Sequence, residues 1–128
     1  MDINWEKLIQ DGVAAIPEKF RSKIDNVAIL LEDEPSREVR IREELDDDET
    51  LLGLYHGIPL PLRGEGYGIG ATLPDTITIY KLPILDEAGD DPAEVARVVR
   101  ETIWHEFGHY LGLDEDEVRR REHLRNAK

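Results

Sequence analysis

The segment from Asp91 to Gly112 constrains the fold most, because it carries the signals that begin and end a long helix. Asp91 is a good N-cap residue, Pro92 suits the first helical position, and Glu94 stands three residues after the cap, as in a capping box. Gly112 can adopt the left-handed backbone conformation that commonly follows a helix. The sequence therefore predicts a helix over about 92–111. Its apolar residues cover most of its circumference, so we expect it to be buried at the centre of the fold.

A metal-binding pattern lies within this predicted helix. The residues His105-Glu106-Phe107-Gly108-His109 match H-E-x-x-H. Side chains four residues apart share one face of a helix, so both imidazoles can bind the same zinc ion. Glu106 projects from the same side, beside a water molecule that the ion would activate. We therefore predict His105 and His109 as zinc ligands and Glu106 as the general base.

A catalytic zinc ion needs a third protein ligand, which we expect after the helix. Gly112 lets the chain turn back toward the histidines, and Glu115 lies three residues beyond it, in the spacing H-E-x-x-H-x-x-G-x-x-E. Glu115 is therefore the predicted third ligand. Asp114 is the main alternative, although capping the next helix would occupy its carboxylate. Water and two later residues complete the alternatives, namely Glu122 and His123.

The remaining pattern predicts an α+β fold in a single domain that spans residues 1–128. Apolar periodicity predicts helices over 3–16 and about 115–125, and β-branched or apolar runs predict strands over 27–31, 51–56 and 76–80. Residues 35–50 fit either a short helix capped by Ser36 or a strand. Pro83 is expected to end the third strand, with one helical turn over 84–88. We thus expect a small three-stranded mixed sheet, a central active-site helix on it, and helices at both ends.

The amino-acid composition limits the cellular compartment, the zinc ligands and the partners that we expect. The chain has no cysteine, which excludes thiolate zinc ligands and fits a reducing cytoplasm. Its net charge of −13 opposes a nucleic-acid partner, because phosphates require nearby lysine and arginine. We expect no secretory signal, because residues 1–6 lack a basic start and a continuous apolar stretch, and no apolar run approaches the length of a membrane span. We therefore expect a cytoplasmic protein without nucleic-acid or membrane partners.

With these residues in place, the chain resembles the small zincin-like metallopeptidases, or mini-zincins, whose motif is H-E-x-x-H-x-x-G-x-x-D. The order of strands and helices and the stretch Leu51–Pro59 are also similar. The resemblance implies a zincin-like fold, zinc on His105 and His109, Glu106 as catalytic base, and a peptide or protein substrate. It also implies that the third strand lies at the cleft edge, where it can pair with an extended peptide, although an ordinary sheet strand fits the sequence equally well. One departure is that Glu115 stands where the family has Asp. Its longer side chain can still coordinate if the backbone lies about one bond further away.

The sequence does not decide which residue orients an imidazole or which residue stabilises the oxyanion. Glu101 or a backbone carbonyl could orient an imidazole N–H. Tyr110, Tyr67 and His56 are candidates for stabilising an oxyanion, which only geometry can decide. For Tyr110 we favour packing in the core, and for His56 a place at the end of a strand.

The sequence thus predicts a zinc-dependent peptidase or amide hydrolase. A catalytically idle zinc-binding domain that acts through partner contacts is the alternative. A third hypothesis is an acidic interaction module in which the histidines only pack.

Overall fold

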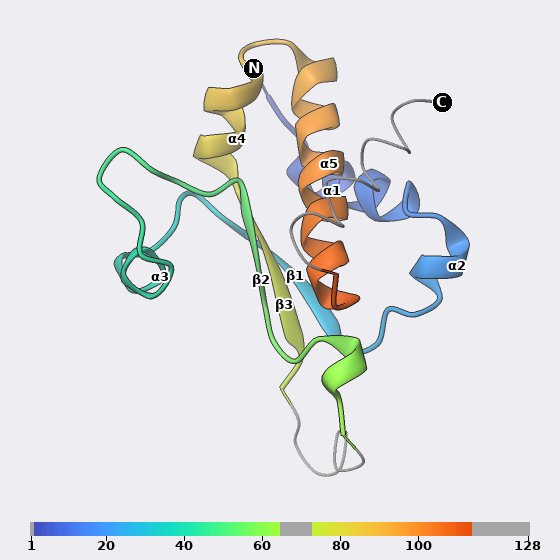
Figure 1. The fold of residues 1–128 in the computed structure, drawn as a ribbon. Coiled ribbons are helices and arrows are strands. Elements are labelled where there is room, and N and C mark those ends of the chain that lie inside the picture. Colours follow the sequence, from blue (N-terminus) through green and yellow to red (C-terminus); the bar gives the residue numbers. More distant parts are fainter. Residues whose placement is uncertain (1, 65–72, 114–128) are drawn as a thin grey trace.

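The computed structural model describes residues 2–64 and 73–113, which form a mixed α+β fold (Figure 1). In chain order the elements are α1 (Trp5–Ala14), α2 (Glu18–Arg21), β1 (Val27–Glu32), α3 (Arg37–Arg42), β2 (Gly53–His56), the 3-10 turn η1 (Leu60–Leu62), β3 (Asp75–Tyr80), α4 (Lys81–Ala88) and α5 (Pro92–Tyr110). Within this part of the chain, no helix is long and apolar enough to cross a bilayer.

The three strands form one mixed sheet in the order β1-β3-β2. Strand β1 runs parallel to β3, with Ile29 opposite Ile77, and β2 runs antiparallel to β3, with Tyr55 opposite Ile77. The expected three-stranded mixed sheet is confirmed. The expectation that the third strand lies at the cleft edge is wrong, because β3 is paired on both sides. The edge strand that contacts α5 is β2.

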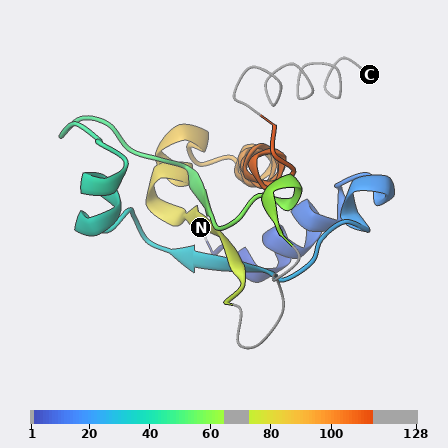
Figure 2. The ribbon, with the colours of Figure 1, turned by 60° about the horizontal axis from the view of Figure 1, so that its bottom comes forward.

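Helix α5 packs on the sheet and against α1, and its buried face supplies most of the core. Figure 2 looks almost along the axis of α5 and shows β2 and η1 beside it. The fully buried side chains of α5 meet those of β3. They include Val95, Val99, Ile103, Phe107 and Tyr110 on the helix and Ile77 and Ile79 on the strand. The prediction of a buried central helix is confirmed.

The other predicted elements agree with the structure, with one correction. Of the two structures predicted within residues 35–50, the helix is the one observed. The Ser36 hydroxyl accepts a hydrogen bond from the Val39 N–H at 3.2 Å and caps α3. The correction concerns Pro83, which lies inside α4 and does not precede it. Because the N–H groups of the first helical turn have no partner within the helix, proline costs no hydrogen bond there. The predicted helix over 115–125 lies outside the described residues.

Candidate metal centre

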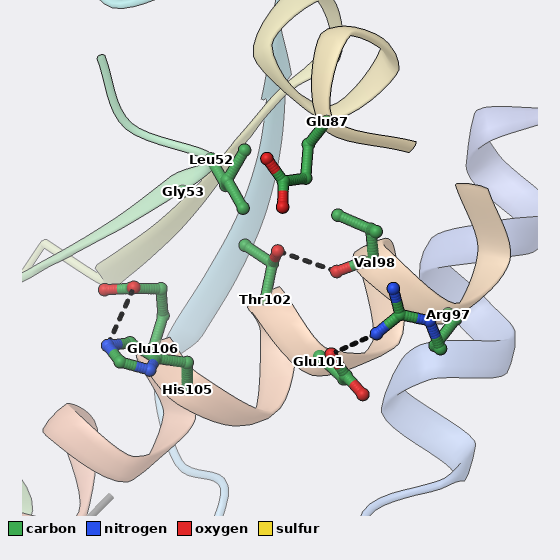
Figure 3. Close-up of a pocket in the computed structure, with 9 residues that line it drawn as sticks. All are labelled: Leu52, Gly53, Glu87, Arg97, Val98, Glu101, Thr102, His105 and Glu106. Atoms are coloured by element: carbon green, nitrogen blue, oxygen red, sulfur yellow. Dashed lines mark hydrogen bonds and ion pairs between the residues drawn. The ribbon is translucent and has the colours of Figure 1, made fainter. Parts of the chain in front are cut away.

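The N-terminal half of α5 begins as its sequence predicts. The Asp91 carboxylate accepts a hydrogen bond from the Ala93 N–H at 3.0 Å, and Pro92 occupies the first turn. Glu94 pairs with Arg97 at 2.8 Å. The Arg97 guanidinium also donates to Glu101 at 2.9 Å (Figure 3). One exposed face of the helix therefore carries an alternating charge network.

The C-terminal end of α5 closes with a left-handed turn. Gly112 has φ +86°, its N–H donates to the His109 carbonyl at 2.9 Å, and the Leu113 N–H donates to the Gly108 carbonyl at 3.0 Å. These two bonds form a Schellman motif and satisfy carbonyls that the helix leaves unpaired. A Cβ on Gly112 would lie 2.7 Å from Pro61 Cγ. The predicted role of Gly112 as the residue that ends the helix is confirmed.

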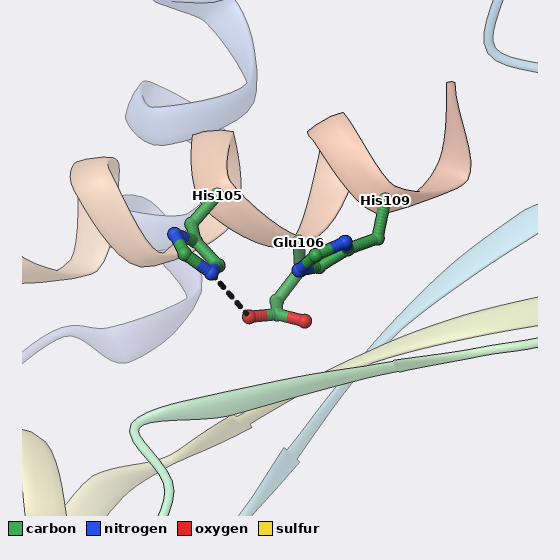
Figure 4. Close-up of side chains that lie close together, drawn as sticks. All are labelled: His105, Glu106 and His109. Atoms are coloured by element: carbon green, nitrogen blue, oxygen red, sulfur yellow. Dashed lines mark ion pairs between the residues drawn. The ribbon is translucent and has the colours of Figure 1, made fainter. Parts of the chain in front are cut away.

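Helix α5 brings the three side chains of the H-E-x-x-H segment together on one side (Figure 4). Ligand atoms of His105, Glu106 and His109 all lie within 4.8 Å of one another. The two imidazole centroids are 5.1 Å apart, and His105 Nε2 is 4.0 Å from Glu106 Oε2. Two nitrogen ligands of one tetrahedral zinc ion lie about 3.4 Å apart, so small side-chain rotations suffice to bind it. The donor set and its spacing fit a metal ion of this kind.

A backbone carbonyl orients one of the imidazoles. His109 Nδ1 lies 3.3 Å from the Leu113 carbonyl oxygen. A carbonyl only accepts hydrogen bonds, so the proton of a neutral His109 ring resides on Nδ1 in this contact. Nε2 is then left with the lone pair that a metal ion requires. Of the two orienting groups that the sequence offered, the carbonyl is seen at His109, while Glu101 binds Arg97.

The edge strand holds the carboxylate of Glu106. The Tyr55 N–H donates to Glu106 Oε1 at 2.9 Å, while Oε2 faces His105. The side chain of Glu106 is only 12% exposed, so this bond compensates part of the cost of burying the charge. Close approach of β2 is needed for it, and Gly53 permits that approach. The isolated glycine in an apolar strand was the available sequence signal, because such a glycine often marks a close backbone contact.

A buried polar network lies behind Tyr55 and was not predicted. The Tyr55 hydroxyl donates to Asp75 at 2.5 Å, and Arg63 pairs with the same carboxylate oxygen at 2.9 Å. Asp75 is 3% exposed and the Arg63 side chain 5%, so each charge depends on the other. Burial, followed by the hydrogen bond to Asp75, raises the pKa of the Tyr55 hydroxyl. This network ties β2, β3 and the segment after η1 together beneath the metal centre.

The other predicted site residues are distributed differently. Tyr110 is fully buried, and its hydroxyl donates to the Lys23 carbonyl at 2.7 Å, which agrees with a packing role. His56 is exposed at the end of β2. The remaining candidates lie outside the described residues. These are Glu115, Asp114, Glu122, His123 and Tyr67.

Two cavities meet at Glu106. The first, of about 310 Å³, lies between α4, the start of β2 and the N-terminal half of α5, and its lining includes Glu87, Thr102 and His105 (Figure 3). The second, of about 560 Å³, lies between β2, η1 and the end of α5, and its lining includes His109. The cluster of His105, Glu106 and His109 is therefore open to solvent from two sides along the edge strand.

Comparison with known proteins agrees with this geometry. A family model for zincin-like metallopeptidases matches residues 24–124, which include the whole sheet and helix α5. No curated protein matches the chain significantly.

Proposed function

This chain belongs to the zincin-like metallopeptidases, and on that premise we propose that it is a zinc-dependent peptidase or amide hydrolase with Glu106 as its general base. The observation that carries the proposal is the convergence of His105, Glu106 and His109 within 4.8 Å on one side of α5. Two imidazoles beside a carboxylate provide both the metal ligands and the proton acceptor that amide hydrolysis needs.

In this proposal His105 and His109 hold the zinc ion, with Glu115 as the third ligand. When bound, zinc supplies a Lewis acid that polarises the scissile carbonyl and lowers the pKa of water toward about 7. The His109 contact with the Leu113 carbonyl supports this role, because it keeps Nε2 unprotonated and fixes the plane of the ring.

The carboxylate of Glu106 moves the proton. Its Oε1 is held by the Tyr55 N–H at 2.9 Å, and its Oε2 is 4.0 Å from His105 Nε2. Oε2 accepts a proton from the attacking water and returns it to the nitrogen of the departing amine, which leaves as a neutral group. Because one oxygen is anchored to β2, the other is positioned before the substrate arrives.

Strand β2 offers a binding edge for the substrate. It is paired with β3 on one side only, so the backbone groups on its other side, apart from the Tyr55 N–H that binds Glu106, can add an extended peptide by hydrogen bonding. That edge is continuous with both cavities, since Gly53 lines the first and Tyr55 the second. A peptide along β2 would therefore pass directly beside Glu106.

The test is the Glu106→Gln variant of the zinc-loaded protein, assayed with a broad peptide library. Loss of the base is expected to reduce kcat by about 10²- to 10⁴-fold while one zinc per chain is retained. Glu38→Gln on α3 is a control with the same loss of charge. If the wild type binds zinc but cleaves no peptide, the protein is instead an idle zinc-binding domain.

The third ligand needs a separate test, by zinc affinity and not by activity. Glu115→Ala should weaken zinc binding strongly, and Asp114→Ala should weaken it little. Unchanged affinity in Glu115→Ala, together with a loss in Asp114→Ala, would transfer the role to Asp114.

A further inference from the structure

We propose that the substrate carries a cationic side chain on one side of the scissile bond and an apolar side chain on the other, and that Glu87 recognises the cation. The inference rests on the proposed function and adds the substrate class. It follows from the contrasting linings of the two cavities that meet at Glu106.

The first cavity combines an apolar floor with one carboxylate directed into it. Leu52 and Val98 supply apolar surface, and Figure 3 shows Glu87 reaching from the last turn of α4 toward the space between them. Its volume of about 310 Å³ is at the lower end for ligand pockets, and suits one long side chain. Lysine and arginine match this lining, because an aliphatic stem can contact the floor while the charged end reaches Glu87.

Arg97 is the cation in the described lining of the first cavity, and two carboxylates already neutralise its charge. Arg97 is bound by Glu94 at 2.8 Å and by Glu101 at 2.9 Å. These two carboxylates raise the pKa of the guanidinium, as expected for a paired cation. Within residues 2–64 and 73–113, no cationic side chain forms an ion pair with Glu87. The cavity therefore presents net negative charge to a ligand, and the chain's overall charge of −13 attracts cations to it from a distance.

The second cavity has the opposite character. Its walls include Leu54, Pro59, Pro61 and Leu62, and Leu62 is 73% exposed. Glu43 also lines it, but pairs with Arg42 at 3.6 Å. A large exposed leucine beside prolines on the rim of a cavity favours contact with an apolar ligand group.

The direction of β2 indicates which side of the scissile bond carries the apolar side chain and which carries the cationic one. The strand runs from Gly53, at the first cavity, to Tyr55, at the second. Antiparallel pairing is the more stable arrangement per residue, so an added peptide would run from the second cavity to the first. The apolar residue then precedes the scissile bond, and the cationic residue follows it.

The decisive experiment compares peptides that differ at one residue after the cleaved bond, with Lys, Gln or Glu at that position. For the zinc-loaded wild type we expect kcat/KM to be about fivefold higher for Lys than for Gln, and lower again for Glu. Glu87→Gln should abolish the preference for Lys over Gln, and Glu87→Lys should shift the preference toward Glu. Glu38→Gln removes an equal charge away from the cavity and should keep the wild-type pattern.

The outcomes separate this inference from the proposed function. Cleavage without a charge preference, or a preference unchanged in Glu87→Gln, overturns the inference and leaves the peptidase proposal standing. If no peptide is cleaved, the peptidase proposal fails. Binding of the same peptides to metal-free wild-type protein, measured by isothermal titration calorimetry, then decides: equal Kd values for Lys and Gln peptides overturn the inference, and tighter Lys binding that Glu87→Gln removes supports it.

Discussion

Replacing Gly53 by alanine is the sharpest test of how β2 is held against the metal centre. A Cβ built at residue 53 lies 2.6 Å from Thr102 Cγ2, 3.0 Å from the Thr78 carbonyl oxygen and 3.5 Å from Glu106 Cγ. The first two distances are too short for ordinary contact. Thr102 cannot rotate freely away, because it is 6% exposed and its hydroxyl donates to the Val98 carbonyl at 2.7 Å. The strand must therefore move away from α5.

The expected loss of stability in Gly53→Ala follows from overpacking. An extra methyl group in a tightly packed site costs about 1–3 kcal/mol. For a chain of this length, each kcal/mol lowers Tm by about 4 °C, so Gly53→Ala should melt about 4–12 °C below the wild type. Moving β2 also lengthens the bond from the Tyr55 N–H to Glu106, so kcat should fall. Zinc affinity should change little, because the three atoms nearest the added methyl group belong to Thr102, Thr78 and Glu106 and not to a histidine.

Thermal and urea unfolding followed by circular dichroism provide the assay, with two comparison variants. Gly64→Ala is the matched control, because a Cβ there meets no atom of the described residues within 4 Å, and it should be neutral. Thr102→Ser removes the clashing methyl group and keeps the hydroxyl, so it should restore part of the stability of Gly53→Ala. A Gly53→Ala protein within about 0.5 kcal/mol of wild type, or no rescue by Thr102→Ser, would refute the reasoning.

Three further predictions concern the surrounding structure. Gly112→Ala, with φ +86° and a contact to Pro61, should lower the free energy of unfolding by about 1–3 kcal/mol, measured by urea titration. The raised pKa of Tyr55 means that the folded state keeps a proton that the unfolded chain releases above about pH 10, so stability should fall as pH rises past this value, and less in Tyr55→Phe. Zinc at about 100 times its Kd should raise the free energy of unfolding by about 2.7 kcal/mol, and His109→Ala should abolish this shift in a thermal scan with and without chelator.

The parts of the fold that the sequence predicted well depend on local chemistry. Both ends of α5 could be predicted because Asp91, Pro92 and Gly112 act on backbone groups within a few residues of themselves. The same holds for Ser36 at the start of α3. Local rules also explain the error at Pro83. Proline is a helix breaker in the interior of a helix, yet it is tolerated in the first turn, and the sequence alone does not show in which turn it lies.

The strand order could not be predicted in the same way. Alternation along Thr76–Tyr80 indicates a strand, but its neighbours depend on pairing between distant segments. Every residue of β3 except Thr76 is buried, and Thr76 is half-buried, which fits a central strand. The buried Asp75 at its start also requires a partner from elsewhere, but the sequence alone does not show that Asp75 is buried.

The same distinction between local and distant contacts applies to the candidate site. The position of His105 relative to His109 follows from helix geometry, so a four-residue spacing predicts it. The contact between Glu106 and the Tyr55 N–H joins residues far apart in sequence, and its donor is a backbone group that every residue type except proline provides. The ion pair of Arg63 with Asp75 is equally remote. Only the glycine at residue 53 indicated a close approach, without showing what would approach.

The two kinds of contact have different consequences for the site. The histidines belong to a helix whose opposite face is packed in the core, so their spacing depends on α5 alone and survives small movements of the sheet. Glu106 is also bound to β2, so its carboxylate responds to the position of that strand. Under the proposed mechanism, metal binding and proton transfer should therefore be separable by mutation. Changes within α5 should affect both, whereas changes at the interface of β2 with α5 should affect proton transfer first.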